Sequence, residues 1–146
     1  MRKTLLLEAL ALLLLFSSAY KINPASTIEA HITVVPDDYP TIQEAAAHAV
    51  DSDTMLVKAG TYLVDENSAI LIDKTLSLLG EDLATTVILG AADESYENGI
   101  AIRLAAPNIT VAGFTIANFG VAIAVANYYT EPYASGCKII NNNIVN

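Results

Sequence analysis

The chain is poor in three features that would otherwise narrow its function: cysteine, positive charge and, beyond its first third, helical periodicity. Its one cysteine, Cys137, excludes any disulfide within the chain. Lysine and arginine number 7 against 16 aspartate and glutamate residues, which makes the formal net charge −9 at pH 7. Because an acidic surface repels phosphate backbones and anionic lipid headgroups, we expect neither nucleic acid nor a membrane surface as a partner.

The first nineteen residues resemble a secretory signal peptide. Arg2-Lys3 makes a basic start, an apolar run follows, and small residues precede a cleavage position after Ala19. The apolar run is too short for a typical membrane-spanning helix. Glu8 inside it is unusual, and an uncleaved anchor is the alternative. We expect residues 1–19 to be a signal peptide, residues 20–30 to be a leader, and the protein to be secreted, periplasmic or at the cell surface.

One short helix is predicted after this leader. The segment Thr41-Ile-Gln-Glu44 has the form of a capping box with Thr41 as the N-cap. Pro40 discourages an earlier helical residue, and Asp51-Ser52-Asp53 is expected to end the helix. The predicted apolar face is narrow and suits a lid. Its members are Ile42, Ala45, Ala46, Ala49 and Val50.

Beyond Val50 the apolar residues alternate at every second position, as they do in strands. The runs are short, and most of them stop at glycine, asparagine or aspartate. A doubly wound sheet would need crossover helices between its later strands, and a sandwich fits strands this short less well. The favoured fold class is an all-β solenoid, in which three short parallel strands make each turn. The predicted strands lie around residues 31–35, 55–57, 70–72, 76–78, 87–89, 100–104, 109–111, 114–116, 121–125, 137–139 and 144.

A weak internal repeat agrees with a solenoid. Two ten-residue segments that begin at Ile109 and Cys137 align at an offset of 28 residues. Gly113 then aligns with Asn141, and these two residue types tolerate the left-handed backbone that a corner requires. The repeat predicts that successive turns stack at this spacing.

Several short segments, read in order, resemble the opening of right-handed parallel β-helix proteins, the pectin-lyase-like superfamily. The most similar groups are NosD-like copper-binding surface proteins and the N-terminal third of pectin methylesterases. The resemblance implies a right-handed parallel β-helix whose early helix covers one end, and it implies no single activity, because one fold hosts many functions. The segments are Tyr39-Pro-Thr-Ile-Gln-Glu-Ala45, Val57-Lys-Ala-Gly-Thr-Tyr62, Leu76-Ser-Leu-Leu-Gly-Glu81, Thr86-Val-Ile-Leu-Gly90 and Gly113-Phe-Thr-Ile116.

Residues 31–146 are interpreted as the N-terminal cap and first turns of this solenoid. The last six residues, 141–146, fall within a repeat and show no closing cap. Since solenoids usually need capped ends, we expect an apparently truncated coil, with the missing C-terminal turns of the same chain as its partner.

Residues able to ligate metals are scattered along the chain. His31, His48, Met55 and Cys137 lack metal-ligand spacing, so copper ligands are not transferred from the NosD-like proteins. Paired carboxylates recur at turns, where aspartate is expected for backbone reasons. We predict no metal, cofactor or catalytic residue. The carboxylates are Asp37, Asp38, Asp51, Asp53, Glu81, Asp82, Asp93, Glu94 and Glu97.

Four residues are predicted to bind a ligand. Arg103 is the only arginine after the signal segment, and alternation points it outward. An exposed ion-pair partner is its alternative role. Tyr128, Tyr129 and Tyr133 lie in the long loop before Cys137, where aromatic rings can stack on sugars or pack within the loop.

Two functions are compatible with these features. The preferred one is a non-catalytic extracytoplasmic scaffold or carbohydrate-interacting module, whose partners are polysaccharides or cell-surface glycans. The alternative is the N-terminal fragment of a polysaccharide-active enzyme, an esterase or lyase whose catalytic turns lie beyond residue 146. The Gln-Ala-Val and Gln-Asp-Thr segments typical of pectin methylesterases are missing from these residues.

Overall fold

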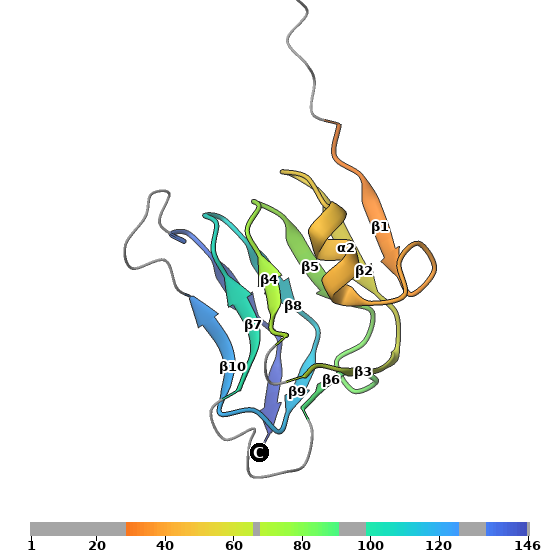
Figure 1. Ribbon diagram of the computed structural model, residues 1–146, viewed down its shortest axis with the longest axis vertical. Helices are drawn as coiled ribbons and strands as arrows, with labels where there is room; N and C mark the ends of the chain where they lie inside the picture. The colour runs from red at the N-terminus through yellow and green to blue at the C-terminus, as the bar shows by residue number, and fades with distance from the viewer. Residues whose placement is uncertain (1–28, 66–67, 91–98, 126–133, 146) are drawn as a thin grey trace, which may run out of the picture.

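The computed structural model describes residues 29–65, 68–90, 99–125 and 134–145 (Figure 1). Within these residues one short helix accompanies twelve short strands. The expected signal peptide lies outside them, as does nearly all of the leader, so both remain predictions. The elements are β1 Ile32–Val35, α2 Ile42–His48, β2 Thr54–Val57, β3 Gly60–Leu63, β4 Ile70–Ile72, β5 Ser77–Gly80, β6 Thr86–Leu89, β7 Ile100–Leu104, β8 Thr110–Ala112, β9 Thr115–Ala117, β10 Val121–Val125, β11 Lys138–Ile140 and β12 Asn143–Val145.

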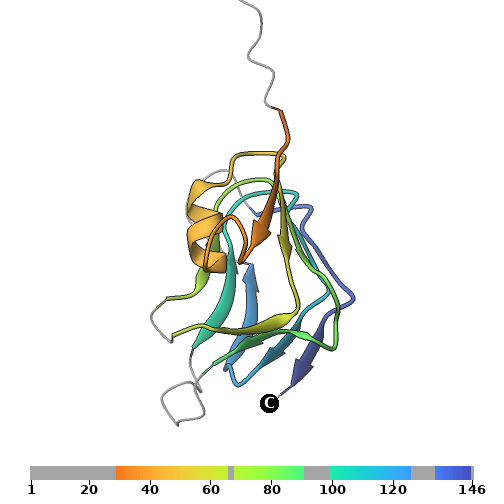
Figure 2. The same ribbon diagram turned by 90° about the vertical axis from the view of Figure 1, so that its right-hand side faces the viewer.

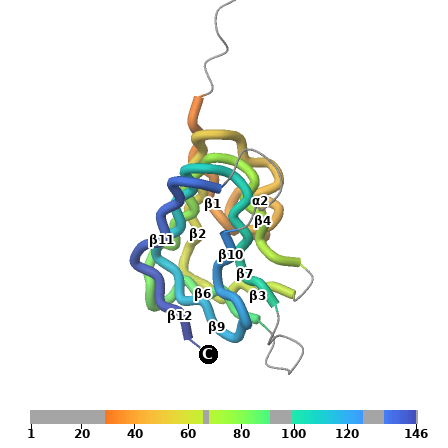
Figure 3. Tube along the Cα trace, turned by 90° about the vertical axis from the view of Figure 1, so that its left-hand side faces the viewer, coloured from red at the N-terminus to blue at the C-terminus, as the bar shows by residue number. Residues whose placement is uncertain are grey.

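The strands form three sheets in which neighbouring strands are parallel. The strand orders are β1-β2-β5-β8-β11, β12-β9-β6-β3 and β10-β7-β4. Successive strands along the chain belong to the three sheets in a repeating order, so β2, β3 and β4 make one turn and β5, β6 and β7 make the next. Successive turns lie one behind another in Figure 2, and Figure 3 shows the opposite end, where the last turn is blue. The predicted all-β solenoid is confirmed, and the doubly wound sheet and the sandwich are excluded.

The predicted 28-residue offset is confirmed between the last turns. Thr110 of β8 is aligned with Lys138 of β11. At the next corner Gly113 and Asn141 have φ angles of 84° and 51°, so both take the left-handed conformation that their alignment predicted. The Gly113 N–H donates to Asn141 O at 2.9 Å, which joins the two corners directly.

The other turns do not keep this spacing. Thr54 of β2 is aligned with Ser77 of β5, 23 residues later. Ser77 is aligned in turn with Thr110, 33 residues later. Loops of different length absorb the difference while the strands stay in register, and this explains why only two copies of the repeat are visible in the sequence.

The core is a set of apolar rows inside the tube. Met55, Leu78 and Val111 are aligned on neighbouring strands of one sheet, and each is fully buried. Burial of each such side chain contributes roughly 1.5–3 kcal/mol relative to its exposure. The other two sheets supply buried pairs in register, which are Ile88 with Ile116 and Ile70 with Ile102.

Helix α2 begins where the capping box predicts. The Thr41 Oγ1 accepts the Glu44 N–H at 3.1 Å, so Thr41 is the N-cap. The helix lies against β4 at the N-terminal end of the coil (Figure 1). No helix among the described ranges has the length and apolar character needed to cross a membrane.

The helix ends earlier than predicted, at His48. Ala49 is extended, with ψ 153°, and it remains buried. The Val50 N–H donates to Asp53 Oδ2 at 2.8 Å, a bond that competes with continuation of the helix. The prediction that Val50 belongs to the apolar face is wrong, because Val50 is 45% exposed.

Strand β3 was not predicted as a strand. Sequence analysis gave no strand to Gly60–Leu63, whose exposed residues include Thr61 and Leu63. The segment is a strand because Gly60, Thr61, Tyr62 and Leu63 are aligned with Thr86–Leu89 on β6. This segment is therefore a strand because it pairs with a later turn of the coil, and the local pattern of apolar residues does not predict that pairing.

Candidate ligand-binding face

A groove lies between helix α2 and strand β4, on the outer side of the β4–β7–β10 sheet. Its volume is about 330 Å³, at the lower end of the roughly 300–1,000 Å³ that small-ligand sites occupy. The groove exists because α2 closes the end of the coil without covering all of β4. The lining residues are Gln43, Ala46, Ala47, Ala69, Leu71, Asp73 and Lys74.

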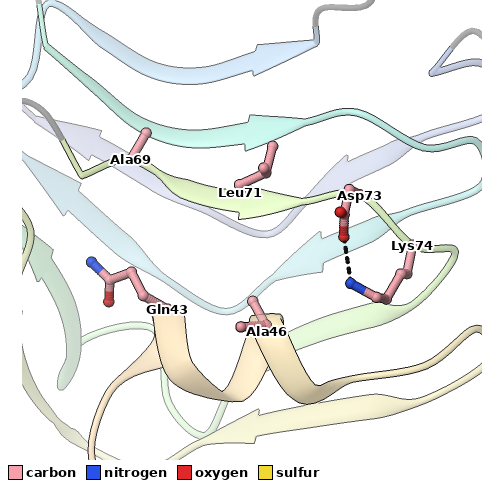
Figure 4. Close-up of a pocket in the computed structure, with 7 residues that line it drawn as sticks. Gln43, Ala46, Ala69, Leu71, Asp73 and Lys74 are labelled. Carbon is pink, nitrogen blue, oxygen red and sulfur yellow. Dashed lines mark hydrogen bonds and ion pairs between the residues drawn. The ribbon is translucent and has the colours of Figure 1, made fainter.

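The groove has polar groups at its two ends and apolar side chains between them (Figure 4). The amide of Gln43 lies at one end, where its Nε2 donates to the Ser68 carbonyl at 3.3 Å. Asp73 and Lys74 lie at the other end, with Nζ and Oδ1 2.6 Å apart. Leu71 lies between them and is 47% exposed. The groove therefore offers an exposed apolar surface between two sets of hydrogen-bonding groups.

Arg103 extends this surface away from the helix. It is aligned with Leu71 on one side and with Ala124 on the other, so these three residues form one row across the sheet. Its side chain is exposed, as alternation predicted. Arg103 forms no salt bridge with another described residue, and its alternative role as an ion-pair partner stays a prediction.

The three predicted tyrosines lie outside the described residues. Tyr128, Tyr129 and Tyr133 belong to the segment 126–133 that follows β10. The last residue of β10, Val125, is aligned with Leu104, the neighbour of Arg103 along β7. The last described residue before the tyrosine segment therefore lies on the strand next to that of Arg103.

Sequence analysis did not select the groove residues. Gln43 was noted only as part of the capping box, and Leu71 only as the middle of a predicted strand. Asp73 and Lys74 follow β4 directly and carry no motif. The helix and β4 are separated by more than twenty residues, and only the closing of the coil brings them together.

Most of the described carboxylates accept backbone N–H groups at turns, as predicted, whereas Asp37 pairs with Lys58. Asp53 is nearly buried and accepts two backbone N–H groups, from His31 at 2.9 Å and from Val50 at 2.8 Å. Among the described residues no group of three or more histidine, cysteine, aspartate or glutamate side chains is arranged to hold a metal ion. Asp93, Glu94 and Glu97 lie outside those residues. The other carboxylates that accept backbone N–H groups are Asp38, Asp51, Glu81 and Asp82.

His48 and Cys137 have local structural partners. His48 is exposed, and its ring stacks on that of Tyr39 with centroids 4.8 Å apart. Its Nδ1 lies 2.9 Å from Glu44 O, and since a carbonyl only accepts, Nδ1 carries the proton. Cys137 is half-buried against the core, and its thiol donates to Ala106 O at 3.5 Å.

Lys58 and Tyr62 share a corner with acidic groups. The Lys58 ammonium lies 2.5 Å from Asp37 Oδ2, and the hydrogen bond and charge of Asp37 raise the pKa of Lys58. Tyr62 donates to Lys58 O at 2.9 Å. Burial raises the pKa of Tyr62, and the charges of Glu81 and Asp37 raise it further. Both side chains therefore hold their protons more tightly here than their ordinary pKa values imply.

The chain matches no protein-family model, no curated protein and no solved structure. The stacked parallel sheets are seen in the structure. Membership of the pectin-lyase-like superfamily stays a prediction from the sequence.

Proposed function

We propose that this protein is an extracytoplasmic, non-catalytic β-helix repeat protein of pectin-lyase-like type that interacts with carbohydrate. The ligand-binding face is the outer surface of the β4–β7–β10 sheet. A solenoid suits this role because its turns hold a long outer surface rigid with little chain.

The observation that carries the proposal is the continuity of the groove with Arg103. Leu71 belongs both to the groove and to the row that contains Arg103. A sugar ring placed on Leu71 would bury its C–H face and leave its hydroxyls near Gln43 and Asp73. The guanidinium of Arg103 would then donate to oxygens of a neighbouring ring along the same face.

The signal-like leader agrees with this function. A secreted or surface location would bring the protein to polysaccharides or cell-surface glycans. Its net negative charge disfavours binding to nucleic acids and anionic membranes. Tyr128, Tyr129 and Tyr133 follow β10 in the sequence and stay predicted ligand-binding residues, because their rings can stack on sugars.

A glycan panel tests the proposal with matched variants. The wild-type protein should bind at least one glycan, and Leu71→Ser and Arg103→Ala should each weaken that binding about tenfold, as expected for loss of one apolar or charged contact. Leu63→Ser and Lys138→Ala are the controls, because they remove a leucine side chain and a positive charge at exposed positions of other sheets.

The possible outcomes separate the functions. A flat response of the wild-type protein across the panel would reject carbohydrate binding. Equal losses in Leu63→Ser and Leu71→Ser would place binding elsewhere. Release of shortened or de-esterified glycan during the assay would instead favour the enzyme alternative.

A further inference from the structure

The outer edge of β1 is the place where the first sheet of the coil could pair with another chain. β1 is the terminal strand of its sheet. The Thr54 N–H donates to His31 O at 2.8 Å, and the Lys58 N–H donates to Val35 O at 2.9 Å. In a parallel pair, successive residues direct their backbone N–H and C=O groups alternately to one side of the strand and to the other. The backbone groups of His31, Thr33 and Val35 therefore face β2, and those of Ile32 and Val34 face the outer edge.

Asp38 occupies the outer edge at Val34. Its Oδ2 accepts the Val34 N–H at 2.7 Å. Its own N–H donates to the Val34 carbonyl, also at 2.7 Å. One residue thus satisfies both backbone groups that Val34 would otherwise offer to an incoming strand.

The loop that carries Asp38 is held in place at its other contacts. It turns back beside the outer side of β1 (Figure 1). Asp37 forms an ion pair with Lys58 on the following turn. Tyr62 donates to Lys58 O at 2.9 Å, next to that ion pair. The loop is therefore fastened to the coil independently of the bonds between Asp38 and Val34.

The neighbouring part of the edge needs such protection. Ile32, the other residue that faces outward, is 71% exposed. An unpaired strand edge with an apolar side chain is a template for pairing with the same edge of a second copy. At this end of the coil α2 lies against β4, whereas no element of the described residues covers the outer edge of β1 at Ile32.

We propose that Asp38 blocks self-association of this chain through β1. The partner excluded is a second copy of the same protein, which would pair its own β1 with the exposed edge and bury Ile32. The contact is independent of any glycan on the β4–β7–β10 sheet, so the proposed function and this contact can fail separately.

Sedimentation velocity over a concentration series tests the proposal. Asp38→Ala removes the carboxylate, and Asp38→Asn keeps an acceptor oxygen. Asp65→Ala removes the same charge at an exposed position away from β1. Asp38→Ala should lower the dimer dissociation constant about tenfold relative to Asp65→Ala, and Asp38→Asn should stay within about twofold of the wild type. Equal dissociation constants for Asp38→Ala and Asp65→Ala would overturn the proposal.

Two further measurements keep the test decisive if Asp38→Ala unfolds. Amide hydrogen exchange of the wild-type protein should be at least about tenfold slower at Val34 than at Ile32, because among the described residues of the outer edge only Val34 has its N–H bonded. Equal exchange at the two positions would overturn the proposal. Where Asp38→Ala is folded and associates, adding Ile32→Lys should restore the monomer, since a lysine on the edge opposes pairing. Continued association of the double variant would also overturn the proposal.

Discussion

Gly80 and Gly113 lie so close across neighbouring turns that neither position has room for a side chain. A Cβ on Gly80 would lie 2.2 Å from Gly113 O, and a Cβ on Gly113 would lie 2.6 Å from Gly80 O. Gly113 also has a φ of 84°, which disfavours other residues. This contact lets the turns approach where the chain leaves the first sheet.

Gly80→Ala should lower the free energy of unfolding by about 3 kcal/mol, the upper end of the range for overpacking, because the obstacle is backbone. Gly60→Ala is the matched control, since a Cβ there would meet only the Tyr62 ring at 3.5 Å. Its effect should stay within about 0.5 kcal/mol. Chemical denaturation of both variants measures the difference, and equal midpoints would show that the turns can separate at no cost.

Removal of the Asp53 carboxylate should destabilise the fold more than removal of any other described carboxylate. Asp53→Ala leaves the His31 and Val50 N–H groups without their buried acceptor, and it should lower the free energy of unfolding by about 3 kcal/mol. Asp53→Asn retains one carbonyl oxygen and should lose about half as much. Asp65→Ala supplies the charge control. Equal Tm values for Asp53→Ala and Asp65→Ala in thermal unfolding would contradict the structural role of Asp53.

The corner of Lys58 and Tyr62 predicts a loss of stability at alkaline pH. Both groups have raised pKa values in the folded protein, so the native state holds their protons more tightly than the unfolded chain does. Their contribution is therefore fully present below about pH 10, the ordinary range of these groups, and is lost as the pH rises through the folded-state values.

The alkaline effect can be measured as the fall of Tm between pH 9 and pH 11.5. The double variant Lys58→Met/Tyr62→Phe should show a shallower fall than the wild type. Lys138→Met, which changes an exposed lysine on β11, should keep the wild-type slope. A double variant with an unchanged slope would mean that other groups govern the alkaline transition.

The local features of the fold could be predicted from the sequence because they depend on neighbouring residues. The N-cap at Thr41 is a contact between residues three apart. The left-handed corners at Gly113 and Asn141 follow from residue type. The 28-residue register was visible because two successive turns happen to keep the same loop length.

The features that sequence analysis missed depend on distant residues. The helix stops at His48 where Asp53 takes the Val50 N–H. The groove exists only because closing the coil brings Gln43 of α2 near Leu71 of β4. Arg103 was selected from its rarity and outward alternation, but its place in a row with Leu71 follows from a register that no local pattern contains.

The most direct test of the account is to map carbohydrate binding on the folded protein. Backbone amide shifts would be followed by NMR while the best-binding oligosaccharide from the panel is titrated into the wild-type chain. We predict saturable shifts at Ala69–Ile72 and at Arg103 with its neighbours on β7, with little change on β3 and β6. Shifts confined to β3, β6 and β9, or none that saturate, would contradict the assignment of the β4–β7–β10 sheet as the ligand-binding face.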